Sequence, residues 1–225
     1  ASVVFSSTMA PYAQELLPRV PMLVDLVDVD SAKWTQYAPA HRWPLSWVYR
    51  REGRRLLAHE RDMALAARRS FLVTPQEVEL FASLAPECRD RVEAAGNGVD
   101  AERFRPDPAL PSPFAADERA IVFTGAMDYW PNVDAVVWFA NEVLPRIRER
   151  EPRASFWIVG RNPTPAVQAL ASDAVHVTGT VPQVEPYLQH AAAVVAPLRV
   201  ARGIQNKILE AMAMGQPVIT VPSCA

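Results

Sequence analysis

The segment from residue 202 to residue 219 places a cation and a carboxylate on one side of an expected helix. At about 3.6 residues per turn, Gly203, Lys207 and Glu210 fall within one narrow arc of that helix. Free N–H groups and the positive end of the helix dipole favour a phosphate at such a helix start, and a lysine adds to this attraction. A carboxylate beside them can accept hydrogen bonds from sugar hydroxyls. The segment therefore predicts a ligand with phosphate and hydroxyl groups.

The same helix also allows a simpler interpretation. Ile204, Ile208, Leu209 and Met212 point away from the charged arc, and we expect them to lie mostly toward a core. On the helix alone, an ordinary amphipathic helix with a surface Lys–Glu pair explains the pattern equally well.

A glycine-led loop at residues 125–132 is the second candidate. It follows an apolar run, and in an open parallel sheet the loops after the strands border the ligand crevice. Gly125 allows a ligand to approach the backbone closely, and we expect Asn132 to cap a helix that begins at Val133. The alternative is a plain strand-to-helix connection with Trp130 packed on it.

Asp28 and Asp30 resemble a pair of aspartates that could hold a divalent metal, and alternation places both on one face of a strand end. No third ligand is evident, and a solvent-facing strand end explains the two acids equally well. We therefore expect no metal.

Residues 34–49 are rich in aromatic side chains and lead into Arg50, Arg51, Arg54 and Arg55. From Arg42 to Arg69, eight arginines face three acidic residues, which gives a formal charge of +5. Aromatic rings beside cations can grip a sugar or contact an anionic membrane surface. The alternative is a packed aromatic corner that leads to a solvated helix face.

Composition excludes several other classes. The 225 residues carry a formal net charge of −2, which does not favour nucleic acid as a partner. Cys88 and Cys224 lie far apart, so neither a zinc site nor a disulfide framework is indicated. No dinucleotide fingerprint or P-loop occurs, and no apolar run approaches about 18 residues. We expect a cytoplasmic protein without a cofactor.

Apolar runs alternate with helical patterns along the chain, which favours parallel sheets covered by helices on both faces. In the first part we expect strands at residues 3–6, 22–29, 70–74 and 91–95, with helices at residues 9–17, 46–68 and 75–83. In the second part we expect strands at residues 119–125, 154–160, 175–178, 193–197 and 217–221. The helices between them are expected from residue 133 with a kink at Pro145, and at residues 164–172, 184–191 and 202–215.

Between the two parts, five of the eleven residues from 104 to 114 are proline or aspartate, which is typical of a linker. The expected organisation is a partial acceptor-side domain at residues 1–103, a linker at residues 104–118 and a donor-binding domain at residues 119–225. We thus predict an α/β chain with two Rossmann-like domains. Because the chain begins and ends beside strands, we expect both domains to be truncated.

These motifs resemble the retaining family-four glycosyltransferases of GT-B fold, the glycosyl transferases group 1. Asn97-Gly98-Val99-Asp100, followed by Phe104 and Pro106, is similar to the family's interdomain linker. Val73-Thr74-Pro75, followed by Glu77, is similar to the approach to that linker, and residues 125–135 resemble a glycine–methionine–PN loop. The helix with Lys207 and Glu210 resembles the donor-binding signature of two glutamates separated by seven residues. Residues 25–31 and 202–215 are similar to a sugar transferase group of exopolysaccharide and exosortase (PEP-CTERM) gene systems.

The resemblance implies an enzyme that moves a sugar, with retention, from a nucleotide diphosphate sugar to a hydroxyl of a saccharide or lipid-linked acceptor. The first glutamate of the signature would fall at position 202, where this chain has Arg202, and the usual basic pair is absent from residues 126–131. We therefore expect Arg202 and Lys207 to be catalytic, meeting the phosphate charge. The expected donor-binding residues are Gly125, Gly203, Ile204, Lys207 and Glu210, with Glu210 holding the ribose hydroxyls.

Two other functions stay open at this point. One is a nucleotide-sugar epimerase of the same fold. The other is a non-catalytic GT-B binding or scaffold module, which Arg202 and the missing basic pair make conceivable. Peripheral contact with the inner face of an anionic membrane is a further expectation for the four arginines at 50, 51, 54 and 55.

Overall fold

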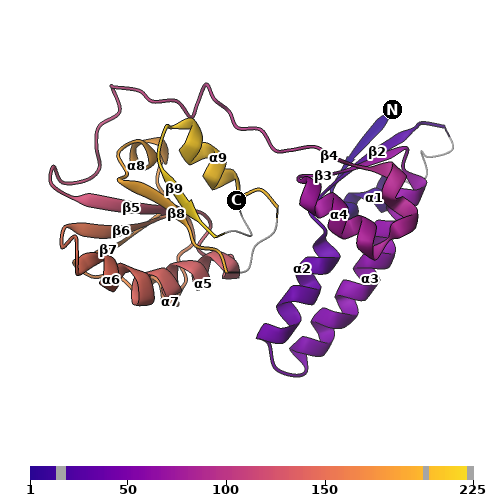
Figure 1. The fold of residues 1–225 in the computed structure, drawn as a ribbon, viewed down its shortest axis with the longest axis horizontal. Helices are drawn as coiled ribbons and strands as arrows, with labels where there is room; N and C mark the ends of the chain where they lie inside the picture. The colour runs from indigo at the N-terminus through magenta and orange to yellow at the C-terminus, as the bar shows by residue number, and fades with distance from the viewer. Residues whose placement is uncertain (14–18, 200–202, 222–225) are drawn as a thin grey trace. The chain divides into compact units, whose positions relative to one another are not determined.

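A computed structural model of the chain describes residues 1–13, 19–199 and 203–221, with the side chain of residue 40 left aside. These residues form two compact units (Figure 1). The first unit comprises residues 1–97 together with 203–204, and the second comprises residues 98–199 together with 205–221. Each unit is an α/β layer structure built on one parallel sheet, as the alternating pattern predicted.

The first unit contains a four-stranded parallel sheet in the order β1-β2-β3-β4. Its strands are β1 (Ser2–Phe5), β2 (Met22–Val27), β3 (Arg69–Leu72) and β4 (Val92–Ala94). Its helices are η1 (Ser7–Met9), α1 (Ala10–Ala13), α2 (Asp30–Tyr37), η3 (Ala38–Ala40), α3 (Leu45–Ala66), α4 (Pro75–Leu84) and η4 (Pro86–Arg91). Of the helix expected at residues 9–17, residues 14–17 lie outside the described residues.

Local signals explain how the first unit is held together. Thr74 caps α4 because its hydroxyl accepts the Glu77 N–H at 3.0 Å, and Pro75 occupies the tolerated first turn. The buried Glu77 carboxylate in turn accepts the Val29 N–H at 2.8 Å, which ties α4 to the loop after β2. Gly53 lets α3 approach α2 closely, because a Cβ there would lie 2.6 Å from the Thr35 hydroxyl.

The second unit contains a five-stranded parallel sheet in the order β7-β6-β5-β8-β9. Its strands are β5 (Arg119–Thr124), β6 (Ala154–Val159), β7 (Val175–Gly179), β8 (Ala193–Ala196) and β9 (Val218–Thr220). Its helices are α5 (Trp130–Trp138), the π-helical η5 (Phe139–Val143), α6 (Leu144–Arg148), α7 (Pro165–Gln168), α8 (Glu185–Gln189) and α9 (Asn206–Ala213). Helices α5, α6 and α7 lie on one side of this sheet, and α8 and α9 lie on the other (Figure 1).

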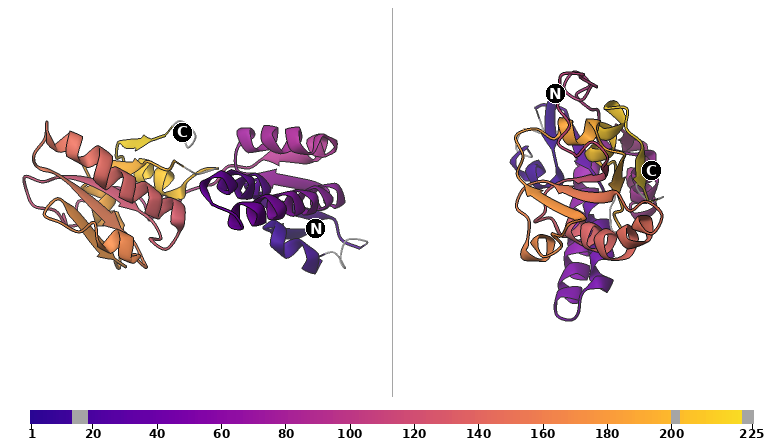
Figure 2. Two further views of the ribbon diagram at one scale, coloured as in Figure 1. Left: turned by 90° about the horizontal axis from the view of Figure 1, so that it is seen from below. Right: turned by 90° about the vertical axis from the view of Figure 1, so that its left-hand side faces the viewer.

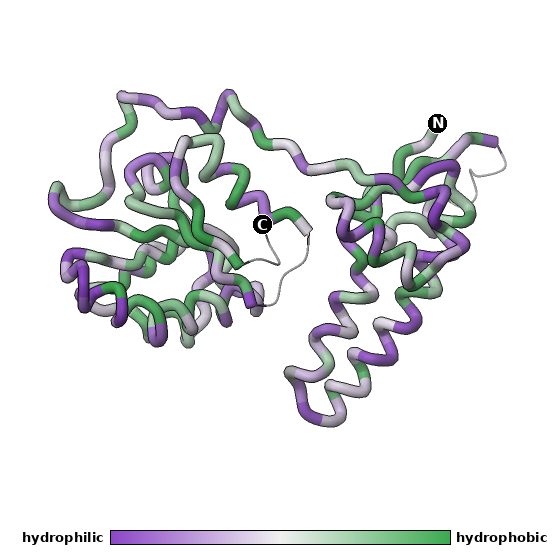
Figure 3. Tube along the Cα trace, viewed as in Figure 1, coloured by the Kyte–Doolittle hydropathy of each residue, from purple (hydrophilic) through white to green (hydrophobic). Residues whose placement is uncertain are grey.

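Burial on both faces explains why the strands of the second unit read as apolar runs. Phe123 and Phe156 lie in the core on the α5 side, whereas Val122 and Val194 lie in the core on the α9 side. Figure 3 shows hydrophobic residues concentrated along the strands, and Figure 2 shows the helices of each unit beside its own sheet. A π-helical turn, η5, separates α5 from α6 directly before Pro145, so the α-helical hydrogen bonding is interrupted at the place where the proline predicted an irregularity.

The stretch expected to be a linker is irregular but not separate from the second unit. Phe104 is buried in that unit's core, and the Phe114 ring centroid lies 5.1 Å from that of Trp157. Composition predicted the lack of regular elements but not these two aromatic contacts. The predicted domain limits at 1–103, 104–118 and 119–225 stay predictions.

Candidate functional site

The strand order places the candidate site at one end of β5. Along the chain, β6 and β7 add to one side of β5, whereas β8 and β9 add to its other side. Such a reversal creates a crevice outside the carboxyl ends of the two central strands, where open α/β sheets bind ligands. The loops that follow β5 and β8 border this crevice, and both were candidates from the sequence.

Glycines bring the backbone close together at this edge. Gly125 and Gly160 follow β5 and β6 with φ angles of +156° and +157°, a region that side chains rarely adopt. A Cβ on Gly160 would lie 1.7 Å from the Gly125 carbonyl oxygen. The Met127 N–H also donates to the Arg161 carbonyl at 2.8 Å, which fixes the two loops to each other. The loop after β5 therefore lies on a rigid support.

Lys207 points from the first turn of α9 toward the loop after β5. Its Nζ donates to Asn132 Oδ1 at 2.9 Å and lies 3.9 Å from the centroid of the Phe123 ring. The Asn132 amide donates in turn to the Ala126 carbonyl at 2.9 Å. A Cβ on Gly125 would lie 3.2 Å from Lys207 Nζ. The structure thus brings together Gly125 and Lys207, which are 82 positions apart in the sequence.

The start of α9 corrects one expectation. The helix begins at Asn206 rather than at residue 202, so Gly203 precedes it and does not share a helical arc with Lys207 and Glu210. Gly203 has a φ of +66° and lies so close to the first unit's Asp28 that a Cβ would be 1.9 Å from its carboxylate oxygen. Gly203 and Ile204 both group with the first unit, and Arg202 lies outside the described residues.

The set of α9 residues that pack in the core also differs from the expected one. Ile208 packs against the core and Leu209 is half-buried, but Met212 is 62% exposed, so its expected core position is wrong. Ala211 and Met214 lie in the core instead.

Glu210 lies in a cluster of charges on the α8 side of the sheet. Burial raises the pKa of Glu210, while the charges of Arg103 and Lys207 oppose the rise and Glu185 adds to it. The Arg103 guanidinium donates a hydrogen bond to the buried Glu185. Burial by itself would raise the pKa of Glu185, but the bond from Arg103 helps to lower that pKa below its usual value. The other Glu185 oxygen, Oε2, has no hydrogen-bond partner among the described residues. Arg103 thus forms a hydrogen bond with Glu185 and interacts through its charge with Glu210.

Sequence reasoning missed the roles of three of these residues. Asn132 is not a helix cap, because α5 begins at Trp130 with Tyr129 at the capping position. Its side chain instead connects Lys207 to the loop after β5. The first turn of a helix tolerates a proline, so Pro131 could have indicated that the helix begins earlier. Arg103 and Glu185 are 82 positions apart, so no local pattern could have paired them.

The two aspartates in the first unit do not lie on one face of a strand end, contrary to the prediction from the sequence. Asp28 lies in the loop after β2, and Asp30 is the first residue of α2. Lys33 Nζ lies 3.3 Å from an Asp28 carboxylate oxygen and 2.9 Å from one of Asp30. Burial raises the pKa of Asp28, and Lys33 opposes that rise. Within the described ranges, no group of three or more His, Cys, Asp or Glu side chains is arranged to hold a metal ion.

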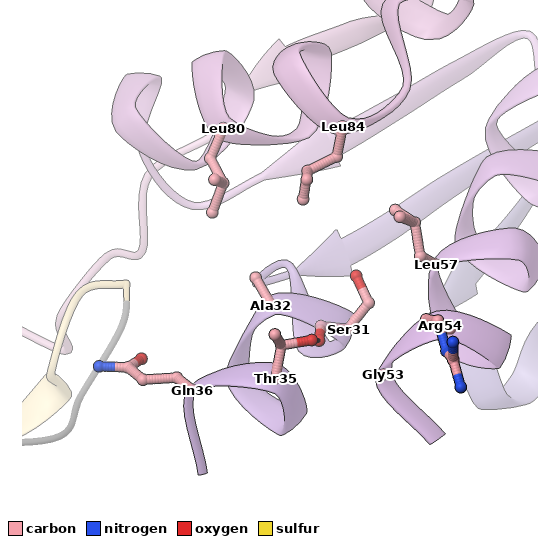
Figure 4. A pocket seen from close by; sticks show the side chains of 9 residues that line it. All are labelled: Ser31, Ala32, Thr35, Gln36, Gly53, Arg54, Leu57, Leu80 and Leu84. Atoms are coloured by element: carbon pink, nitrogen blue, oxygen red, sulfur yellow. Dashed lines mark hydrogen bonds between the residues drawn. The ribbon is translucent and has the colours of Figure 1, made fainter. Parts of the chain in front are cut away.

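The first unit also contains a pocket of about 320 Å³ between α2, α3 and α4 (Figure 4). Its wall is largely apolar, with Leu57, Leu80 and Leu84 facing it, and Arg54 is the charged residue of its lining. Of the predicted site residues, only Arg54 lines this pocket. With no carboxylate or imidazole in its lining, the pocket has no acid–base chemistry of its own.

Comparison with known proteins agrees with the geometry of the second unit. Residues 118–225 match the family described as Glycosyl transferases group 1. No curated protein matches the chain in sequence. Residues 118–225 are therefore similar in sequence to the glycosyl transferases group 1 family.

Solved structures extend the likeness of fold to both units. HepE from Anabaena in complex with UDP matches at 12% identity with a TM-score of 0.64, over 99% of this chain and 60% of that one. Sucrose-phosphate synthase from Thermosynechococcus elongatus matches at 17% identity and a TM-score of 0.72, over 99% and 56%. A UDP-forming α,α-trehalose-phosphate synthase from Burkholderia xenovorans matches at 10% identity and a TM-score of 0.65, over 99% and 59%. The chain thus spans about three fifths of the length of these structures and has the α/β fold of two Rossmann-like units known as GT-B.

Proposed function

We propose that the protein is a retaining glycosyltransferase that moves a sugar from a nucleotide diphosphate sugar to a hydroxyl acceptor. The observation that carries the proposal is the meeting of Gly125 and Lys207 at the strand-order reversal of a unit whose sequence matches glycosyl transferases group 1. The HepE structure contains UDP, which makes UDP-sugars the first donors to test.

The proposed chemistry needs a cation more than it needs a base. As the sugar leaves, negative charge gathers on the pyrophosphate, and fixed cations and backbone N–H groups that meet this charge lower the barrier. Lys207 and the positive end of the α9 dipole supply this stabilisation, and Arg202 is proposed to add a second cation. Glu210 holds the ribose hydroxyls, while Gly125, Gly203 and Ile204 bring the backbone close to the donor.

The family resemblance supports a proposal for the acceptor and the pathway. We propose a saccharide or lipid-linked hydroxyl acceptor, a role in exopolysaccharide or glycoconjugate synthesis, metal-independent chemistry and a cytoplasmic location. Peripheral membrane contact through Arg50, Arg51, Arg54 and Arg55 belongs to the same proposal. No helix within the described part of the chain is both long and apolar enough to cross a bilayer.

Two observations favour a second candidate, a non-catalytic binding module. Arg202 stands where the signature's first glutamate is expected, and residues 126–131 contain no arginine or lysine. A direct test mixes the protein with UDP-glucose and other labelled nucleotide sugars, with and without acceptor alcohols, and follows the anomeric configuration of any product by NMR. Transfer with retention supports the transferase, whereas nucleotide binding without turnover of any donor supports the binding module.

A further inference from the structure

The tip of the α2–α3 hairpin (residues 38–47) exposes large apolar side chains. Trp43 is 80% exposed, Trp47 is 53% exposed and Leu45 is 51% exposed. The hairpin extends away from the sheet of the first unit, and the tip is its far end (Figure 1). Two tryptophans and a leucine gathered at a protruding end are a patch that folding of the hairpin does not bury.

The other aromatic residues of the segment show that this exposure is selective. Trp34, Tyr37 and His41 surround Tyr49, with ring centroids at 5.4, 6.1 and 4.8 Å from its own. These contacts hold α2, α3 and the start of the tip together. The aromatic corner that the sequence allowed as a plain packing unit therefore exists, but Trp43 and Trp47 lie outside it.

Positive charge continues from the exposed tryptophans along α3. Trp47, Arg50, Arg51 and Arg54 follow the i, i+3, i+4, i+7 spacing of one helix face, and the Arg51 guanidinium lies 5.9 Å from the Trp47 ring centroid. From residue 34 to residue 59 there are five arginines and one glutamate, a formal charge of +4 in a chain whose net charge is −2. The hairpin therefore has a charge opposite to that of the rest of the chain.

We propose that this hairpin tip docks on the surface of an anionic membrane. Tryptophan prefers the interface between lipid headgroups and acyl chains, where its ring is buried and its N–H stays hydrated. The arginines on the same helix face reach the phosphate groups, and their long stems cover apolar surface. The tip inserts its apolar residues into the interface, and no part of the hairpin crosses the bilayer. This role deepens the peripheral membrane contact of the proposed function, and because vesicle binding is measured without sugar transfer, it can fail independently of the transferase proposal.

Charge and residue type together select a bilayer over a protein partner. A protein interface as basic as this one needs a matching acidic surface, and its apolar core needs a fitted pocket. A bilayer that contains phosphatidylglycerol offers uniform negative charge above a deformable apolar layer, so it needs no fitted partner. An acidic protein or a second copy of this chain would give a different outcome in the test.

The test measures co-sedimentation of the full chain with phosphatidylcholine vesicles, with and without phosphatidylglycerol. We expect binding to the anionic vesicles only, with a steep loss at high salt because the charges become screened. Trp43→Ala/Trp47→Ala should weaken binding roughly tenfold or more, given the apolar area that two tryptophans bury. Arg50→Glu/Arg54→Glu should weaken it at least as much, since each arginine near an anionic surface contributes a factor of roughly five.

Matched controls separate docking from general surface effects. Tyr12→Ala removes an aromatic residue of the same 80% exposure from another part of the first unit. Arg146→Glu/Arg150→Glu reverses two exposed arginines of the second unit. Both controls should bind vesicles like the wild type, and circular dichroism should show all four variants folded. Quenching of tryptophan fluorescence by brominated lipids should be seen in the wild type and reduced in Trp43→Ala/Trp47→Ala.

Three results would overturn the proposal. One is absence of binding to anionic vesicles at low salt. Another is binding that the tip variants leave unchanged. The third is a wild-type oligomer, seen by analytical ultracentrifugation without lipid, that the tip variants convert to monomer, because the patch would then be an interface between copies of the chain.

Discussion

Replacement of Lys207 by alanine is the most informative perturbation of the candidate site. In the structure its Nζ binds Asn132 Oδ1 at 2.9 Å and lies over the Phe123 ring, so the cation is held at the loop after β5. A hydrogen bond to a charged group is worth about 1.5–3 kcal/mol when formed. Because the phosphate charge grows in the transition state, most of this loss should appear in turnover rather than in KM. We expect kcat to fall roughly ten- to hundredfold, at about 1.4 kcal/mol for each factor of ten.

The assay is release of nucleotide diphosphate from the donor that the wild type uses, measured at saturating acceptor. Lys207→Arg should keep part of the rate, since it retains the charge but not the fit to Asn132. Arg146→Ala, which removes an exposed cation of α6, serves as the control and should leave turnover unchanged. Thermal unfolding should show that Lys207→Ala is folded. A folded Lys207→Ala variant with wild-type turnover would refute the reasoning.

Three further predictions concern the charge cluster, the glycine edge and a buried acid. Arg103→Ala should raise KM for the donor roughly two- to fivefold. It should also move the acidic limb of the kcat/KM profile to higher pH, because loss of the cation raises the pKa of Glu210 further. An acidic limb that stays in place would contradict this prediction. Gly160→Ala should lower the free energy of unfolding by about 2 kcal/mol or more, since its Cβ would meet a carbonyl oxygen at 1.7 Å, whereas Gly98→Ala, with no atom within 4 Å, should be close to neutral in urea unfolding. Burial raises the pKa of Glu60 to about 7 from 4.5, so the folded state binds a proton that the unfolded state has lost, and stability should fall by about 3 kcal/mol as the pH rises from 4.5 to 7. Glu60→Gln should remove that slope, and an unchanged slope would show that other groups cause it.

The sheets could be predicted from the sequence, because parallel strands buried on both faces leave nearly continuous apolar runs. Helix α2 could not, since Trp34 and Tyr37 are residue types that also suit strands, and their packing on Tyr49 decides the outcome. The start of α9 was misplaced because residues 202–205 contain no proline to stop a helix. Gly203 has a positive φ, which is incompatible with an α-helix, but this backbone angle is visible only in the folded chain.

The candidate site shows the same division between local and distant information. Lys207 and Gly125 could be selected one by one, from a helix start and a strand end. That they meet follows from the position of β8 beside β5, which spacing along the chain does not reveal. Asn132, Arg103 and Glu185 have no local signal for their roles, because each partner lies 75 or 82 positions away.

The central claim is that the loops after β5 and β8 form a nucleotide-sugar donor site. Hydrogen exchange with and without UDP tests this claim most directly. The account predicts slower exchange of backbone amides at residues 125–132 and 203–210 when UDP is bound, and no change at the hairpin tip. The protection at residues 125–132 should be lost in Lys207→Ala at the same UDP concentration. UDP binding that leaves both loops unchanged and protects residues elsewhere would contradict the account.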